Sequence, residues 1–178
     1  MTFPSAVASL VFVRDSDETN AVLFADQTGL PADALDALRA VVPLAAQSLG
    51  FTKEVCVKAI SLPPRVAGPN GPQIASIFGL GNRESSVFLE YNRMLGRLPK
   101  QVVPIADDGL GNLFVVSKQN GQVYFWDHKC LDEEASQAAF TLIASSADDF
   151  LSRFVPAPSI NSEELKRGVR SVRLDFLN

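Results

Sequence analysis

The sequence predicts one folded domain of the α+β class, on three observations. Residues 102–126 contain strand-like segments in direct succession, and Asn120-Gly121 between two of them favours a tight hairpin turn because both residues tolerate positive φ. Segments with apolar residues at helical spacing lie before and after these strands. With 178 residues, of which 47% are hydrophobic and 20% charged, the chain has the size and composition of a globular domain.

The N-terminal part is predicted to begin with a hairpin, followed by a helix and a strand. Residues 7–13 and 21–25 are short apolar runs separated by turn-forming residues, which indicates that they pair. Residues 30–42 place apolar side chains on one helical face, with Pro31 suited to the first turn. Residues 53–62 alternate as in a half-buried strand. The segment after them is rich in proline and glycine and is predicted to be a loop.

The middle of the chain is predicted to contain a strand, a helix and three antiparallel strands. The strand covers residues 74–78, and the helix covers residues 84–95. The buried face of this helix is expected to consist of Val87, Phe88, Tyr91 and Leu95. The three antiparallel strands are predicted at residues 101–106, 112–117 and 122–127. The core is expected to include Ile105, Phe125, Trp126 and Phe150.

Two further helices are predicted toward the C-terminus. Residues 145–154 combine serine caps, acidic residues in the first turn and an apolar face. Residues 161–178 begin with a variant capping box and place apolar residues at helical spacing, with basic residues on the other face. We therefore expect a domain over residues 1–155, with a short linker and an amphipathic helix over residues 156–178.

Charge and cysteine content narrow the choice of partners and compartments. The formal net charge of -4 disfavours nucleic acid, which is bound through clustered lysine and arginine, and suits a basic protein partner. The two cysteines cannot form a disulfide framework, which indicates a reducing compartment. No apolar run reaches membrane-spanning length, and no basic region precedes the first one. These observations predict a cytoplasmic protein with no membrane partner.

Two glycine-containing segments resemble ligand loops, but a structural explanation is favoured for both. The Gly-x-Gly turn at residues 79–81 has Glu84 where a dinucleotide-binding turn needs a third small residue. The segment 107–112 lacks the alternating oxygen ligands of a calcium loop, and Lys118 stands where the closing glutamate is required. Aspartates that cap a tight turn and glycines that supply positive φ explain this second segment without a ligand. No cofactor and no metal are expected.

His128 is the only histidine of the chain, which leaves little basis for a catalytic or zinc site. A nucleophilic pair with Cys130 would need a third group to orient the imidazole, and no signature of that arrangement is present. A histidine packed beside Trp126 and hydrogen-bonded to backbone is the favoured interpretation. We expect no catalytic residues.

Acidic residues lie in two places near the three predicted strands: between the first and second strands, and at and after the end of the third strand. Together they are predicted to form a negative rim that steers a basic protein partner, although a solvated loop position is the alternative for any one of them. The predicted partner-binding residues are Asp107, Asp108, Asp127, Asp132, Glu133 and Glu134.

Several of these segments, in the same order, resemble the SUKH superfamily, which contains the yeast cell-wall assembly regulators and many bacterial relatives. The matching blocks are "LPKQVVPIADDGLGNLFVVSKQNGQVYFWDHK" and "IASSADDFLSRF", with residues 77–80 and Tyr91 upstream. The resemblance covers residues 74–154. It implies an α+β fold with a mixed, largely antiparallel sheet flanked by helices.

The resemblance also implies a function based on binding. Bacterial members of the superfamily are mostly immunity proteins that neutralise secreted toxins, and no catalytic residues are attributed to them. We therefore expect an immunity protein that occludes a cognate toxin domain. The alternative is a non-enzymatic scaffold or regulator that binds a resident cellular protein. A small-molecule enzyme would require His128 and Cys130 to line a deep pocket.

Overall fold

The computed structural model describes residues 3–15, 23–64, 71–130 and 136–158. The strands in these residues are β1 (Val11–Asp15), β2 (Ala46–Val57), β3 (Gln73–Phe78), β4 (Val102–Asp107), β5 (Leu113–Ser117), β6 (Val123–Trp126), β7 (Phe140–Ala144) and β8 (Phe154–Pro156). The α-helices are α1 (Ser5–Ala8), α2 (Ala32–Arg39), α3 (Val87–Arg93) and α4 (Ala147–Ser152). Two 3-10 turns are η1 (Ala25–Thr28) and η2 (Gln137–Ala139).

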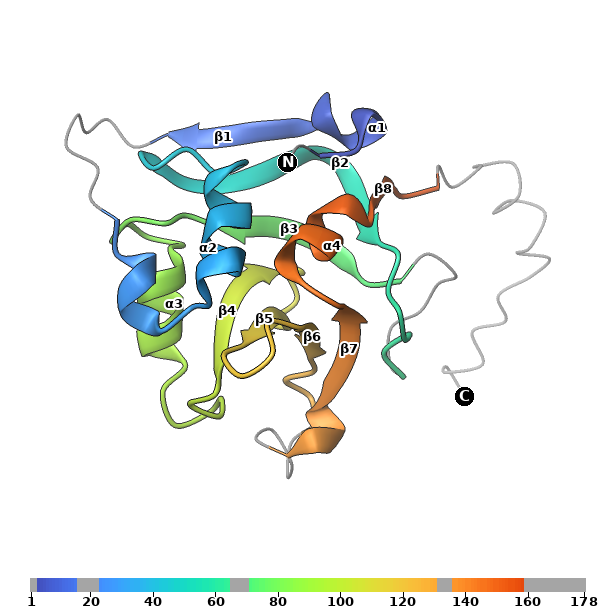
Figure 1. Cartoon of the computed structure of the whole chain (residues 1–178). Coiled ribbons are helices and arrows are strands. Elements are labelled where there is room, and N and C mark those ends of the chain that lie inside the picture. Colours follow the sequence, from blue (N-terminus) through green and yellow to red (C-terminus); the bar gives the residue numbers. More distant parts are fainter. Residues whose placement is uncertain (1–2, 16–22, 65–70, 131–135, 159–178) are drawn as a thin grey trace, which may run out of the picture.

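The described strands form one curved sheet in the order β1-β2-β3-β4-β5-β6-β7, with β8 also paired to β2 (Figure 1). Every pair of these strands is antiparallel. The α+β class is therefore confirmed. Because β3 and β4 are antiparallel neighbours, the Gly-x-Gly turn after β3 does not belong to a parallel strand-helix-strand unit.

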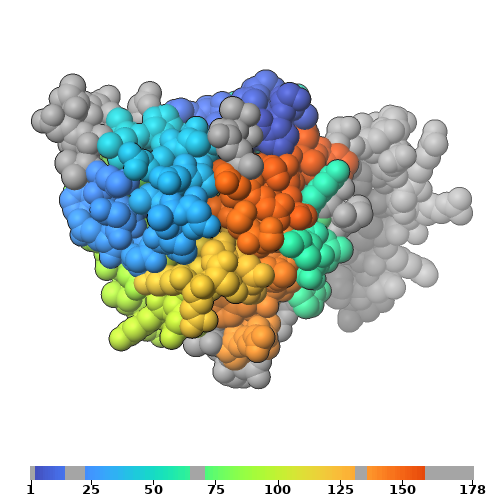
Figure 2. All heavy atoms as spheres, in the orientation of Figure 1, coloured from blue at the N-terminus to red at the C-terminus, as the bar shows by residue number. Residues whose placement is uncertain are grey.

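Two helices cover one face of this sheet. α2 and α4 lie side by side in front of it (Figure 1), and Figure 2 shows them next to the loop between β5 and β6. The face that α2 and α4 bury contains Leu38, Phe150 and Leu151, each fully buried. The Ser146 hydroxyl caps α4 by accepting the Asp149 N–H at 3.1 Å. The helices predicted at residues 30–42 and 145–154 are present, although both are shorter than predicted.

The predicted three-stranded region is confirmed as β4, β5 and β6. Nearly every residue of β4 and β5 is buried, so both faces of these strands are covered. Pro104 lies in the interior of the sheet, but at a register shift between β4 and β5, where a missing N–H is tolerated. The core assignments of Ile105, Phe125, Trp126 and Phe150 are confirmed.

The turn between β5 and β6 is longer than a two-residue hairpin. The Ser117 N–H donates to the Gln122 carbonyl and the Gly121 N–H donates to the Ser117 carbonyl, and of the turn residues only Gly121 has positive φ. Lys118 anchors the loop to α3, because its ammonium group donates to the Tyr91 hydroxyl at 2.9 Å and lies 4.4 Å from the centre of that ring. The β5–β6 loop is therefore packed against α3.

The predicted N-terminal hairpin is wrong. Residues 11–15 form a strand, but its partner is β2, with Val11 opposite Phe51, and the chain before it is the short helix α1. Ala25, predicted to be in a strand, begins a 3-10 turn, and its N–H donates to the Leu80 carbonyl. The apolar runs and turn residues were local signals, whereas the choice of strand partner depends on distant residues.

Two further boundaries differ from the prediction. β2 begins at Ala46, before the alternating segment from which a strand was predicted. The stretch after α4 was predicted as a linker, but Val155 and Pro156 pair with Cys56 and Val55 of β2. The predicted C-terminal helix at residues 161–178 lies outside the described residues.

None of the helices in the described part of the chain combines the length and the apolar composition that a membrane span requires.

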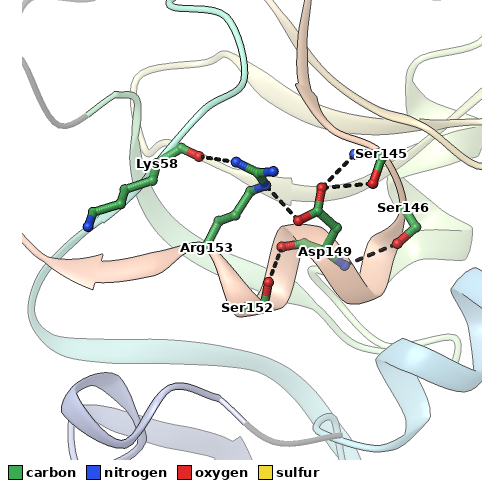
Figure 3. A network of polar contacts seen from close by, with 6 residues as sticks. All are labelled: Lys58, Ser145, Ser146, Asp149, Ser152 and Arg153. Atoms are coloured by element: carbon green, nitrogen blue, oxygen red, sulfur yellow. Dashed lines mark hydrogen bonds and ion pairs between the residues drawn. The ribbon is translucent and has the colours of Figure 1, made fainter.

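A polar network fixes α4 to the end of β2 (Figure 3). The Asp149 carboxylate accepts hydrogen bonds from the Ser145 N–H and hydroxyl and from Arg153 Nε, at 2.8 to 2.9 Å. Arg153 Nη1 donates to the Lys58 carbonyl at 3.0 Å. Burial on its own would raise the pKa of Asp149, but the Arg153 and Ser145 hydrogen bonds outweigh it, and the pKa is lowered.

Asp149→Asn is expected to lower the free energy of unfolding by about 1 kcal/mol at neutral pH, because the charge-assisted contact with Arg153 is lost. A carboxyl with a lowered folded pKa stabilises the protein above its ordinary value of 3.8, and this contribution is lost as the pH falls through the folded value. The difference between variant and wild type should therefore shrink below that pH. Urea unfolding over a pH series measures it, and a pH-independent difference would contradict the argument.

Candidate functional site

The turn between β4 and β5 is held in one conformation by a buried carboxylate. Asp108 is 9% exposed, and its Oδ1 accepts the N–H groups of Leu110 at 2.8 Å and Asn112 at 3.0 Å. Its Oδ2 accepts from the side-chain amide of Asn112. Gly109 and Gly111 both have positive φ, which side-chain-bearing residues avoid. These contacts agree with the interpretation that the aspartates stabilise a tight turn.

Leu110 lies at the tip of this turn and is 70% exposed. It is therefore an exposed apolar side chain on a turn whose backbone is fixed by the hydrogen bonds of Asp108.

Asp107 ties the same turn to β3. Its Oδ2 accepts a hydrogen bond from the Ser76 hydroxyl at 2.6 Å, and its Oδ1 accepts the Gly109 N–H at 2.8 Å. Ser76 and Asp107 also face each other in the register of β3 and β4. The Asp107 side chain is only half-buried and remains accessible from one side.

His128 lies against the turn because β5 and β6 are antiparallel and Leu113 is opposite Trp126. Asn112 Oδ1 accepts the His128 backbone N–H at 3.2 Å and is 2.8 Å from His128 Nδ1. A Cβ at Gly111 would lie only 3.1 Å from Cε1 of the ring, so the imidazole packs directly on the glycine. His128 was expected to bond to backbone, but its ring partner is the Asn112 side chain.

A cavity of about 550 Å³ opens between α3 and this turn. Its polar and charged lining consists of Ser85, Glu90, Arg93, Arg97, Asp107 and His128. The remaining lining is apolar or glycine: Phe78, Met94, Leu113, Gly109 and Gly111. The volume falls in the range of sites that bind small molecules or single side chains, roughly 300 to 1,000 Å³.

Glu90 is the most buried charged residue of this lining, with 9% exposure for the whole residue and 12% for its side chain. It lies on the inward side of α3, three residues after Val87 and four before Met94, which are also buried. Arg93 Nη2 is 2.7 Å from Glu90 Oε2, and the two side chains form an ion pair between a mostly exposed guanidinium and a mostly buried carboxylate. Burial raises the pKa of Glu90, Asp107 acts in the same direction, and Arg93 opposes them.

The two arginines of the cavity are placed differently. The Arg97 guanidinium lies over the Trp126 ring, 5.3 Å from its centre. The Arg93 side chain is 67% exposed, while the carboxylate that it contacts is almost fully covered. Ser85 at the rim has a φ of 60°, an uncommon value for a residue with a side chain.

The sequence of the chain is similar to a known protein family over the residues that form this site. The sequence model of the SMI1 / KNR4 family (SUKH-1) matches residues 64–153, just over half of the chain. The chain belongs to this family. The matched SUKH-1 region contains α3, the β4–β5 turn and every residue that lines the cavity. The resemblance to the SUKH superfamily that the sequence indicated is thereby confirmed.

One curated relative extends the similarity beyond the SUKH-1 match. The SPbeta prophage-derived uncharacterized protein YokK of Bacillus subtilis (strain 168) is 28% identical over 151 residues, which cover 82% of this chain and 77% of that protein. No solved structure matches the chain.

The structure brings three of the predicted acidic residues of this SUKH-1 chain to one end of the sheet. Asp107 and Asp108 lie in the β4–β5 turn, and Asp127 follows β6, where its Oδ1 accepts the Lys129 N–H at 2.9 Å. Asp132, Glu133 and Glu134 lie outside the described residues. A partner-binding role for the six acids stays a prediction.

Sequence reasoning missed the α3 side of the site. The predicted buried face of this helix included Leu95, which is 52% exposed, and omitted Glu90. The available signal was the spacing of Glu90 between Val87 and Met94, but a glutamate on a helix is normally assigned to solvent.

The enzyme alternative required two residues to share a pocket. His128 lines the cavity, whereas Cys130 does not belong to its lining. Among the described residues, no three His, Cys, Asp or Glu side chains are grouped so that they could hold a metal ion.

Proposed function

We propose that this SUKH-1 protein is a cytoplasmic immunity protein that binds a cognate bacterial toxin domain and neutralises it stoichiometrically, without catalytic turnover. Membership of the SUKH-1 family supports the proposal, because the resemblance to the SUKH superfamily implies an immunity role for most bacterial members. The observation that carries it is the β4–β5 turn, in which a buried aspartate fixes the loop that exposes Leu110 beside a charged cavity.

The β4–β5 turn is preorganised for binding, because its conformation is fixed within the protein itself. A stoichiometric inhibitor must obtain its affinity from contacts made on association, and ordering a flexible loop would reduce that affinity. The hydrogen bonds of Asp108 order the loop before the partner arrives. An exposed leucine on such an ordered loop adds to affinity when a partner buries it, because burial removes its apolar surface from water.

Co-expression with a candidate toxin, taken from the gene next to this one, tests the proposal. We expect cells to survive the toxin only when this protein is present, and the purified pair to form a complex of fixed stoichiometry. Inhibition of the toxin by far less than one equivalent would indicate catalysis and contradict the proposal. Failure to protect, together with binding to a resident cellular protein, would favour the scaffold alternative.

Leu110→Ser is expected to weaken the toxin complex about thirtyfold, which corresponds to about 2 kcal/mol of lost interface energy. The Tm should hardly change, because the side chain is exposed. Leu62→Ser is the matched control, since Leu62 is 55% exposed and lies outside the turn and the cavity lining. Calorimetric titration measures both variants, and equal affinity losses would exclude the turn as the contact.

A further inference from the structure

We propose that the cavity between α3 and the β4–β5 turn receives an arginine side chain of the partner protein, which pairs with Glu90 in place of Arg93. This inference rests on the proposed function, because it names the chemistry by which the partner is recognised. It begins from Glu90, a glutamate that lines the cavity and whose side chain is 12% exposed.

The Glu90 carboxylate is incompletely compensated in the free protein. A buried charge is costly unless it is paired and hydrogen-bonded. Its charged partner, Arg93, contacts Oε2 from a side chain that is 67% exposed, so solvent weakens this ion pair. A cation that enters the cavity and excludes water from it would therefore gain more from Glu90 than Arg93 does.

The second carboxylate of the cavity favours a cation as well. Asp107 lines the same space, and its charge raises the pKa of Glu90, so the two carboxylates interact. Of the positive groups, Arg97 is stacked over Trp126, and Arg93 is on a long exposed side chain that can turn toward solvent. With Arg93 displaced, the entering group meets Glu90 and Asp107 in a lining that also contains Arg97.

The shape and apolar lining of the cavity select arginine among cations. A guanidinium has five N–H donors in a planar fork, so it can address two carboxylates at once. Phe78, Met94 and Leu113 provide an apolar wall for the methylene stem of such a side chain. A volume of about 550 Å³ is ample for it.

This arrangement makes Arg93 an internal competitor of the partner. A variant without the Arg93 charge should bind an added guanidinium more tightly. If the cavity were instead an anion site built on Arg93 and Arg97, the same variant should bind its ligand less tightly. Arg93→Gln therefore distinguishes the two chemistries by the sign of its effect.

The probe is N-acetyl-arginine methylamide, titrated into the full-length ¹⁵N-labelled chain at mildly alkaline pH, which favours the ionised form of Glu90 because its pKa is raised. We expect weak, roughly millimolar binding that shifts amide signals of residues 85–97 and 107–113. The citrulline analogue, which is neutral and of similar shape, should bind about tenfold more weakly. Glu90→Gln should weaken arginine binding about tenfold, Arg93→Gln should strengthen it severalfold, and Glu54→Gln, an exposed control on β2, should leave it unchanged.

Equal binding of the arginine and citrulline compounds, or preferential binding of N-acetyl-glutamate methylamide, would overturn the inference. The toxin complex separates this result from the proposed function. If the toxin binds wild type, Glu90→Gln and Arg93→Gln equally, the cavity is not the arginine site, although neutralisation stands. If the arginine compound binds as expected and no toxin is neutralised, the proposed function is wrong and the cavity binds an arginine of another protein.

Discussion

Asp108→Ala is expected to lower the free energy of unfolding by about 3 kcal/mol and to abolish measurable toxin binding. Three donors lose their acceptor: the Leu110 N–H, the Asn112 N–H and the Asn112 amide. Each such hydrogen bond contributes about 1 kcal/mol, and a buried donor left without an acceptor costs more. The two glycines of the turn would then regain conformations that the carboxylate excludes.

Asp108→Asn separates the geometry of this residue from its charge. The amide oxygen can still accept both backbone N–H groups, so part of the stability should return, although its NH2 group would face the donating Asn112 amide. The negative charge is gone. If Asp108 acts by fixing the turn, Asp108→Asn binds toxin nearly as wild type does. If it acts as part of a negative rim, Asp108→Asn loses affinity as Asp108→Ala does.

Urea unfolding and calorimetric titration give the two readouts. Asp36→Ala is the control for loss of an acidic side chain, because Asp36 is exposed on α2. An Asp108→Ala variant with the unfolding midpoint of wild type would show that the carboxylate does not hold the turn. Charge reversal at Asp108 would be a poor test of electrostatic steering, because it would place a cation in a buried cage of N–H donors.

The sequence was sufficient for the parts of the fold that local pattern determines. β4, β5 and β6 follow one another with short turns, so the strand-like apolar segments and the glycines between them were enough to predict them. The pairing of β1 with β2 places Val11 opposite Phe51, and no local signal identifies so distant a partner. The first strand was therefore predicted close to its observed position, but it was paired with residues 21–25 instead of with β2.

The candidate site was predictable on one side only. Asp107 and Asp108 were recognised because adjacent aspartates and glycines are typical of a turn and can be identified from the sequence alone. Glu90 was not, because its burial depends on the packing of α3 against β4, and these elements meet only in the folded protein. A buried carboxylate that contradicts the ordinary preference for exposure is where sequence rules are expected to fail.

Glu90→Gln is expected to raise the free energy of unfolding by about 1 kcal/mol at neutral pH while it weakens the toxin complex about a hundredfold. The gain follows because a neutral amide avoids the cost of a buried charge that Arg93 compensates incompletely. The loss follows because the partner's arginine would no longer meet a carboxylate, an interaction of about 3 kcal/mol when desolvated. Opposite signs for stability and binding are the mark of a residue retained for function.

The pH dependence of this stability difference has a defined sign. The pKa of Glu90 is raised above its ordinary value of 4.5, by burial first and by Asp107 in addition. A carboxyl with a raised folded pKa favours the folded state below its unfolded pKa, and this contribution is lost as the pH rises through the folded value. The advantage of Glu90→Gln over wild type should therefore be small below 4.5 and grow toward neutral pH.

The other charged groups that line the cavity are Arg93 on α3, Arg97 after it, Asp107 on β4 and His128 after β6. They are the same in both proteins, so the difference between the two unfolding curves isolates Glu90. Glu84→Gln, at an exposed position before α3, should show no such pH dependence. A Glu90→Gln variant less stable than wild type at neutral pH would mean that the Arg93 ion pair outweighs the cost of burial, and the cavity would then hold no uncompensated carboxylate for a partner to meet.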